Sequence, residues 1–420
     1  MTVVVTGMGS VSCFGSGTTA LWDGLLRADQ LPVPAPDDCG LSFRPNFYAG
    51  PETRSPDDPS GSAPQDATHG VSSHAPGGRT SALIAAAVAE AVGEAGLTHE
   101  QLADAGLSVG TSLGDIDLAE PADSATAAAA SAGSGPRGSD SAAGQAGEDE
   151  RGLATHHVAS VIAARFGIGG PNHTLSTACS AGAYAVSWGA ELIETGQADL
   201  VLVCGGDAFS RVAVGTLERF ELVDSEHCRP FDTARAGMVT GEGAVAMVLE
   251  SAESARRRGA TAHAELAAHA WSCDAHHPMA PEPTGEQLRR SVADVLADVP
   301  EAPGAVVLHR AGVAGNDTVE ADAVGEALSV LIAPAEVVGS APKAVMGHTA
   351  GAAGVFGCAI AALILRHGLV PPNAHVENVD PDCPLAVPVG NPVPLARPSV
   401  LVSGTGFGGN NAVLLWRAAE

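Results

Sequence analysis

Residues 173–207 read HTLSTACSAGAYAVSWGAELIETGQADLVLVCGGD, and this stretch combines strand, turn and helix patterns. It opens with a short strand pattern that enters a turn of small residues around Cys179. An apolar helix pattern follows and ends at Gly196, because glycine readily adopts the conformation that closes helices. The last part, 198–207, is apolar between Asp199 and Asp207, which is typical of a fully buried strand. The stretch therefore predicts a strand–turn–helix–strand unit.

Strand and helix patterns alternate on both sides of this unit. Strands are predicted at 3–9, 107–112 and 305–312, helices at 80–97, 154–168, 317–332 and 351–368, and a hairpin at 399–416. Repeated units of this kind predict an α/β fold in which helices cover buried sheets. The pattern begins again after residue 250, so we expect two comparable halves, 1–250 and 251–420.

Charge and composition exclude several classes of protein. The 48 acidic and 21 basic residues give a net charge of −27, which argues against a nucleic-acid partner, because phosphate binding needs clustered Lys and Arg. No apolar run approaches the roughly 20 residues of a membrane span, and the N-terminus lacks a secretory signal. The eight cysteines form no CxxC pair, so we expect a cytoplasmic protein. Low-complexity tracts at 51–78 and 120–151 predict loops outside the core.

Cys179 lies in the turn where a strand passes into a helix. Backbone N–H groups at a helix N-terminus favour a thiolate, and the small neighbours Ala178 and Gly182 leave room for a substrate. The alternative is a cysteine that only fills the core. Cys204 and Cys358 fit that alternative, because apolar residues surround them in a strand and a helix pattern.

Four segments resemble the β-ketoacyl-acyl-carrier-protein synthases, the ketosynthases. Residues 173–182, HTLSTACSAG, are similar to the family's active-site pattern T-A-C-(S/A)-(S/A/T)-G. VVVTGMGSVSCFG (3–15), CRPFDTARAGMVTGEGAVAMVLE (228–250) and GTGFGGNNA (404–412) resemble its opening strand, its long central signature and its closing glycine loop. The resemblance is to the elongating type and implies the thiolase-like fold, a duplicated five-layer αβαβα architecture with the active site where the halves meet.

The family pairs its cysteine with two histidines. KAVMGHTAGAAG (343–354) resembles the family pattern K-x-x-x-G-H-x-x-x-A-G and supplies Lys343 and His348. HRAGVAGND (309–317) resembles the pattern H-G-T-x-T-x-x-N-D and supplies His309, with Glu320 following. The resemblance implies that Lys343 pairs with Glu320 and maintains the charge balance around His348.

The resemblance also implies the chemistry. Cys179 would accept an acyl group from a carrier thioester, which splits one difficult step into two. Backbone N–H groups of Cys179 and Phe407, with Gly408 beside them, would form the oxyanion hole of this transfer. A malonyl thioester would then lose CO2, and the two imidazoles would stabilise the enolate oxygen.

The sequence departs from the family beside His309. Arg310 replaces a glycine, and Ala311 and Val313 replace two threonines that in the family hydrogen-bond the carrier's pantetheine arm. Asp115 also stands in an atypical loop, GTSLGDID, next to a stretch that lies near the acyl channel in relatives. These four residues are therefore candidates for the substrate channel.

Three functions remain open at this point. The first is a decarboxylating ketosynthase of a polyketide or fatty-acid-like pathway. The second is a ketosynthase-like acyltransferase or cyclase that keeps the acyl-Cys step without elongating the chain. The third is a non-catalytic partner subunit resembling the chain-length factors, which lack the cysteine. A thiolase is disfavoured, since Cys383 lacks the glycine setting of that family's second cysteine.

The resemblance also implies the partners. We expect an acyl carrier protein that presents substrates on phosphopantetheine, a homodimer or a heterodimer with a chain-length-factor-like subunit, and no resident cofactor. Arg256, Arg257 and Arg258 form a candidate docking patch, although such a run is more often a solvated helix face. His156–His157 and His276–His277 lack further ligands at a credible spacing, so we expect no metal. No membrane partner is expected.

Overall fold

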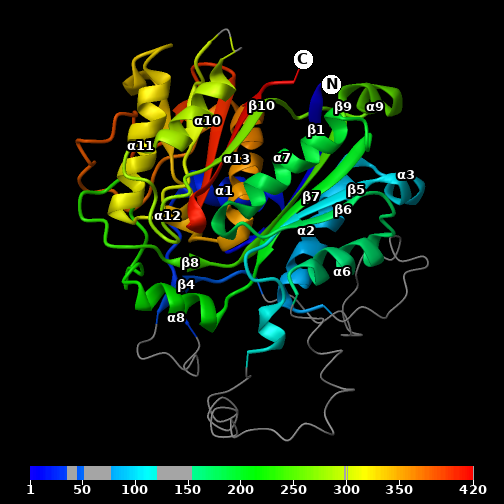
Figure 1. Ribbon diagram of the computed structural model, residues 1–420, viewed down its shortest axis with the longest axis horizontal. Coiled ribbons are helices and arrows are strands. Elements are labelled where there is room, and N and C mark those ends of the chain that lie inside the picture. Colours follow the sequence, from blue (N-terminus) through cyan, green and yellow to red (C-terminus); the bar gives the residue numbers. More distant parts are fainter. Residues whose placement is uncertain (36–44, 52–76, 121–153, 298, 300, 420) are drawn as a thin grey trace, which may run out of the picture.

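A computed structural model describes residues 1–35, 45–51, 77–120, 154–297, 299 and 301–419. The two low-complexity tracts predicted at 51–78 and 120–151 lie almost entirely outside these described residues. Sheets and helices alternate in layers across the molecule (Figure 1).

One continuous sheet runs through the centre. Its strands are β1 (Val3–Ser12), β2 (Gly15–Ser16), β5 (Gly106–Gly110), β6 (Asn172–Leu175), β7 (Leu200–Asp207), β9 (Gly243–Ser251), β10 (Ala264–Cys273), β11 (Ala305–Val307), β12 (Val338–Ser340), β15 (Ser399–Gly406) and β16 (Asn410–Arg417). Short ladders involve β3 (Val33–Pro34), β4 (Asn46–Tyr48), β8 (Thr240–Gly241), β13 (Leu369–Val370) and β14 (Val393–Pro394).

The order of these strands repeats. It reads β12-β11-β15-β16-β10-β1-β9-β7-β5-β6, with β2 paired to β1. Numbered along the chain, the strands β1, β5, β6, β7 and β9 lie in the order 3-2-4-5-1, and β10, β11, β12, β15 and β16 lie in the same order. The fifth strand of each set, β9 or β16, is antiparallel to both neighbours. The architecture is therefore duplicated, and an antiparallel β1–β10 pair joins the two sets.

The helices and short 3-10 turns connect these strands. The helices are α1 (Thr18–Arg27), α2 (Arg79–Ala95), α3 (His99–Asp104), α6 (His156–Phe166), α7 (Ala181–Glu194), α8 (Arg211–Arg219), α9 (Ala252–Arg258), α10 (Glu286–Leu296), α11 (Ala314–Leu328), α12 (Lys343–Met346) and α13 (Ala353–His367). The 3-10 turns are η1 (Ile116–Leu118), η2 (Ala178–Ser180), η3 (Pro334–Glu336), η4 (Ala350–Ala352) and η5 (Phe407–Gly409).

The two faces of the sheet bury different clusters. Val203 on β7 and Val402 on β15 face a central core that includes α7 and α13. Their chain neighbours point the other way, since strand side chains alternate: Leu202 packs with α2 and α6, and Leu401 with α10 and α11. Figure 1 shows α10 and α11 on one side of the molecule and α2 and α6 on the other. The predicted thiolase-like five-layer fold is confirmed.

The helix α13 is the most apolar element of the central layer. By length and composition, the stretch 350–367 could cross a membrane, but 72% of it is buried inside the protein. Every side chain from Gly354 to Ile364 is buried, so the apolar character of α13 is that of a core helix.

The two central helices cross where glycine removes side chains. A Cβ on Gly182 would lie 2.6 Å from the Gly351 carbonyl oxygen, and one on Gly354 would lie 2.2 Å from the Ala183 nitrogen. Each helix is preceded by a 3-10 turn whose first residue, Ala178 or Ala350, has a positive φ, 52° and 47° respectively. The crossing therefore brings the turn before α7 against the turn before α13.

Replacing Gly354 by alanine is expected to lower the free energy of unfolding by about 1–3 kcal/mol, because the backbone of α7 leaves no room for a methyl group. Gly93 in α2 is the matched control, since nothing lies within 4 Å of its Cβ position. Gly93→Ala should be neutral or should stabilise the protein by up to about 1 kcal/mol. Urea unfolding measures both variants, and equal midpoints would contradict the close crossing.

Candidate active site

The Cys179 thiol lies between two chain segments that are distant in sequence. β6 ends at Leu175, and η2 carries Cys179 immediately before α7, as the sequence predicted. The β15–β16 hairpin approaches from the other side. It can do so because a Cβ on Gly406 would lie 2.9 Å from the Ser180 nitrogen. Sequence reasoning found the hairpin but could not place it against η2.

Opposing effects act on the Cys179 thiol. The backbone N–H groups of Cys179 and Phe407 donate toward the sulfur, and these contacts and the charge of Lys343 lower its pKa. Burial outweighs them and raises the pKa to about 11, with a further contribution from Asp207. The sequence argument that the helix N-terminus would favour a thiolate therefore names a real but smaller effect. The resting residue is a thiol at neutral pH.

His309 and His348 face each other beside Cys179. Their ring centroids are 5.2 Å apart and the ring planes are nearly perpendicular, at 86°. Burial, followed by the positive charge of Lys343, holds the pKa of each imidazole well below its usual range. Both rings are therefore neutral at pH 7. The two ring nitrogens of His348 have no hydrogen-bond partner among the described residues, so its N–H is available to a substrate.

Two carboxylates from α11 hold the loop that carries His309. Glu320 accepts from the His309 and Arg310 nitrogens, at 2.6 and 2.8 Å, and from the Ser403 hydroxyl. Asp317 accepts from the next two nitrogens, those of Ala311 at 3.0 Å and Gly312 at 3.1 Å. These bonds explain why β11 ends at Val307 although the sequence predicted a strand to 312. Sequence reasoning gave Asp317 and Ser403 no role.

Lys343 acts on this loop from the opposite side. Its ammonium group donates to the His309 carbonyl oxygen. Within the described chain, no direct ion pair joins Lys343 to Glu320, contrary to the predicted pairing, although the charge of Glu320 raises the Lys343 pKa against the larger lowering by burial. The two residues therefore hold opposite sides of the same peptide segment.

Most of the predicted site residues line one cavity. Cys179, His309, His348, Glu320, Ala311, Val313 and Phe407 line it, together with Met238, Asp274, Met279, Leu288, Asn316 and Asn411. A nucleophile, two neutral imidazoles and two N–H groups directed at the nucleophile thus share one cavity. Such a set can attack a thioester carbonyl and stabilise an oxyanion.

Two family models match this chain. The model of the β-ketoacyl synthase N-terminal domain matches residues 1–255, and the model of the C-terminal domain matches residues 263–377. The chain belongs to the β-ketoacyl synthase family.

Relatives and solved structures agree with this membership. A 3-oxoacyl-(acyl-carrier-protein) synthase 2 of Synechocystis sp. is 32% identical over 61% of this chain and 64% of its own length. The tetracenomycin polyketide synthase ketoacyl synthase alpha subunit of Streptomyces glaucescens is 36% identical over 62% of this chain and 63% of its own length. The chain thus matches just under two thirds of each. The solved structure of the ishigamide ketosynthase/chain length factor matches this chain with a TM-score of 0.85 at 30% identity. The match covers 100% of this chain and 99% of that chain.

Besides Lys343, three further predicted site residues lie outside the cavity lining. The Asp115 carboxylate accepts from the Ser81 nitrogen at 2.8 Å and is fully buried at the start of α2, so it supports that helix end. The Gly408 nitrogen donates to the Pro278 carbonyl oxygen at 2.7 Å, which leaves Phe407 as the donor of this turn to the sulfur. The Arg310 side chain is 1% exposed and turns into the protein.

The described residues contain one group with metal-ligand chemistry. Glu191, Glu194 and His269 bring ligand atoms within 4.8 Å of one another, away from the cavity lining. Exposed carboxylates commonly cluster without an ion, and Glu194 already contacts His269 at 3.4 Å. The expectation of no metal stays a prediction.

Proposed function

We propose that this chain is a β-ketoacyl-acyl-carrier-protein synthase-like acyltransferase that forms a C–C bond by decarboxylative Claisen condensation. One observation carries the proposal. The Cys179 sulfur faces two backbone N–H groups and shares its cavity with two imidazoles that are neutral at pH 7. We also propose the roles named above for Cys179, His309 and His348.

In the first step the Cys179 sulfur attacks the carbonyl carbon of an acyl thioester. The N–H groups of Cys179 and Phe407 stabilise the oxyanion of the tetrahedral intermediate. The C–S bond to the carrier then breaks, and the proton of the Cys179 thiol leaves with the carrier thiol. The products are an acyl-Cys179 thioester and a free carrier, so no cofactor is required.

In the second step a malonyl-type thioester occupies the same cavity. Its carboxylate leaves as CO2, and the electron pair forms an enolate whose oxygen accepts N–H donation from His309 and His348. Neutral imidazoles suit this role, because each offers one N–H without abstracting a proton from carbon. The enolate carbon attacks acyl-Cys179, the sulfur leaves as a thiolate, and one proton from solvent restores the thiol.

The printed names of the relatives support the setting of this reaction. They favour a discrete ketosynthase of polyketide or fatty-acid biosynthesis that acts on carrier-bound substrates. The ishigamide structure supports a pair with a chain-length-factor-like subunit as the alternative to a homodimer. We further propose a cytoplasmic location and a division of labour in which 1–250 carries the nucleophile and 251–420 carries the histidines.

A second candidate is an acyltransferase or cyclase that keeps the acyl-Cys step without elongation. Ala311 and Val313 favour it, because both line the cavity without a hydroxyl group. The deciding experiment measures intact-protein mass after incubation with an acyl-carrier thioester, then adds malonyl carrier and follows CO2. An adduct followed by CO2 and a β-ketoacyl product supports condensation. An adduct that another nucleophile or ring closure discharges without CO2 supports the second candidate, and no adduct from any donor contradicts both.

A further inference from the structure

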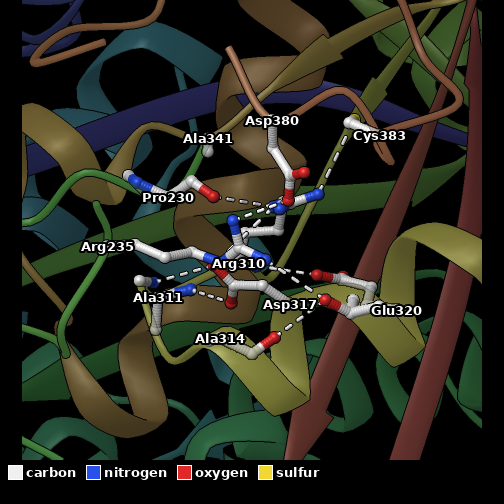
Figure 2. Close-up of polar contacts among 12 residues, drawn as sticks. Pro230, Arg235, Arg310, Ala311, Ala314, Asp317, Glu320, Ala341, Asp380 and Cys383 are labelled. Carbon is white, nitrogen blue, oxygen red and sulfur yellow. Dashed lines mark hydrogen bonds and ion pairs between the residues drawn. The ribbon is translucent and has the colours of Figure 1, made fainter. Parts of the chain in front are cut away.

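Arg310 connects three segments from inside the protein. Its Nε donates to the Pro230 carbonyl oxygen at 3.1 Å, and its Nη1 contacts the Cys383 sulfur at 3.7 Å. The guanidinium carbon lies 4.6 Å from the centre of the Phe231 ring, which is fully buried. Figure 2 shows the Arg310 side chain among Pro230, Cys383 and Asp317. Arg310 is therefore a buried, permanently charged residue that follows directly after His309.

Asp317 is the acidic partner of this guanidinium. The Arg310 Nε lies 3.7 Å from the Asp317 Oδ2, and both side chains are 1% exposed. The same carboxylate accepts the N–H groups of Ala311 and Gly312, one with each oxygen. An ionised carboxylate accepts strongly at both oxygens, whereas in the protonated form one oxygen becomes a hydroxyl and the charge that strengthens both bonds is lost. The ionised form therefore holds the two nitrogens more tightly.

The contacts of Arg310 contribute little to the free energy of unfolding. The ion pair is long, and the Nη2 group has no hydrogen-bond partner among the described residues. A buried ion pair with incomplete hydrogen bonding gains little over apolar side chains of the same volume. A role in the site next to it accounts better for a charge at this position.

We propose that Arg310 is a positioning residue whose guanidinium keeps the Asp317 carboxylate ionised, so that this carboxylate holds the loop 309–313 and with it His309. The residue touches neither the cavity nor the nucleophile, so it acts through Asp317. The effect on turnover rests on the proposed function, whereas the effect on the loop does not.

The charges around Asp317 make the effect measurable near neutral pH. Burial raises the Asp317 pKa to about 7, and Arg310 is the strongest of the groups that lower it. Glu320, on the same helix, raises this pKa, and Arg235, from the segment after β7, lowers it. Cys228, whose own pKa is raised by burial and then by Asp317, is a neutral thiol, and Lys343 on α12 adds a further cation.

The sign of the pH effect follows from this arrangement. As the pH falls through the Asp317 pKa, the carboxylate takes up a proton, and its bonds to the two N–H groups of the loop weaken. Loss of the Arg310 charge raises this pKa further, because an opposite charge at this distance lowers a carboxyl pKa by about 1–3 units. The loop would then loosen at a higher pH than in the unaltered protein.

Lys343 is the only lysine of the chain and donates to the His309 carbonyl oxygen. Protein labelled with ¹³C-lysine therefore carries a single side-chain NMR signal that reports the position of the loop. We expect this signal to show a step with pH in the unaltered protein. In Arg310→Met the midpoint should rise by about 1–3 pH units, and in Arg310→Lys it should stay within about 0.5 unit.

Two further variants test whether the pH step of the Lys343 signal comes from Asp317. Asp317→Asn should remove it, since no titrating carboxylate remains. Arg258→Met is the matched control, because Arg258 is a largely buried arginine paired with Glu250 at 2.7 Å, and this variant should leave the midpoint unchanged. An unchanged midpoint in Arg310→Met, or a step that persists in Asp317→Asn, would overturn the proposal. If Arg310→Met does not fold, Arg310→Gln, which also removes the charge but keeps polar atoms, takes its place with the same expected rise of the midpoint.

Kinetics separate this proposal from the proposed function. The acid limb of the turnover profile should move with the NMR midpoint in Arg310→Met, and the rate should recover at high pH. A merely structural role would lower turnover equally at every pH. If the unaltered protein shows no condensation at any pH, the proposed function fails while the NMR result still decides the role of Arg310.

Discussion

Replacing Cys179 by alanine is expected to remove the acyl adduct and to lower turnover about 10³-fold or more, because Cys179 is the only thiol among the described residues that line the cavity. The His309 and His348 rings remain in place in this variant, since the thiol supports neither of them. Intact-protein mass measures the adduct, and product formation from labelled malonyl carrier measures turnover.

Cys273 provides the control for this experiment. It is an exposed free cysteine at the end of β10, next to the cavity-lining Asp274. Cys273→Ala should keep both the adduct and turnover, because its sulfur is accessible but lies outside the cavity. An adduct that persists in Cys179→Ala and disappears in Cys273→Ala would place the covalent chemistry on the surface and refute the assigned nucleophile.

Replacing Glu320 by alanine is expected to lower the free energy of unfolding by about 3–5 kcal/mol, because it leaves buried polar groups and a nearby buried cation uncompensated. The nitrogens of His309 and Arg310 and the hydroxyl of Ser403 all lose their acceptor. Turnover should fall as well, since His309 loses its anchor. Urea unfolding and turnover are measured on the same preparation.

Glu326 offers the matched control on the same helix. Its side chain is 67% exposed and lies 3.6 Å from Arg289 in a surface ion pair. Glu326→Ala should change the free energy of unfolding by no more than about 1 kcal/mol, as exposed pairs contribute little. Similar losses in the two variants would mean that Glu320 stabilises only the helix and not the loop.

Local patterns in the sequence predicted the elements but not their contacts. The strand, turn and helix of 173–207 are present, and Gly196 follows α7 with a positive φ of 72°. The turn, the helix and the hairpin at 399–416 are determined mainly by residues close in sequence, so their sequence patterns predict them. The strand order, by contrast, depends on which distant segments pair.

In the site, too, the sequence predicted the individual residues but not the contacts between distant segments. Motif spacing identified Cys179, His309 and His348, which do share one cavity. The bond from Lys343 to the His309 carbonyl joins residues that are distant in sequence and leaves no trace in either motif. The direction of the Arg310 side chain was unpredictable for the same reason, because it depends on Phe231 and Asp317 closing around it.

The paired turns before the central helices have a consequence for how such a site could arise. Ala178 and Ala350 open equivalent turns, but Cys179 follows Ala178 directly, whereas His348 lies two residues before Ala350. A half-length ancestor that assembled as a symmetric pair would have carried identical residues in both turns. Fusion into one chain removes that constraint. One turn can then carry the nucleophile, and the segment beside the other turn can carry the hydrogen-bond donor. An asymmetric active site can therefore evolve once each half is encoded by its own stretch of sequence.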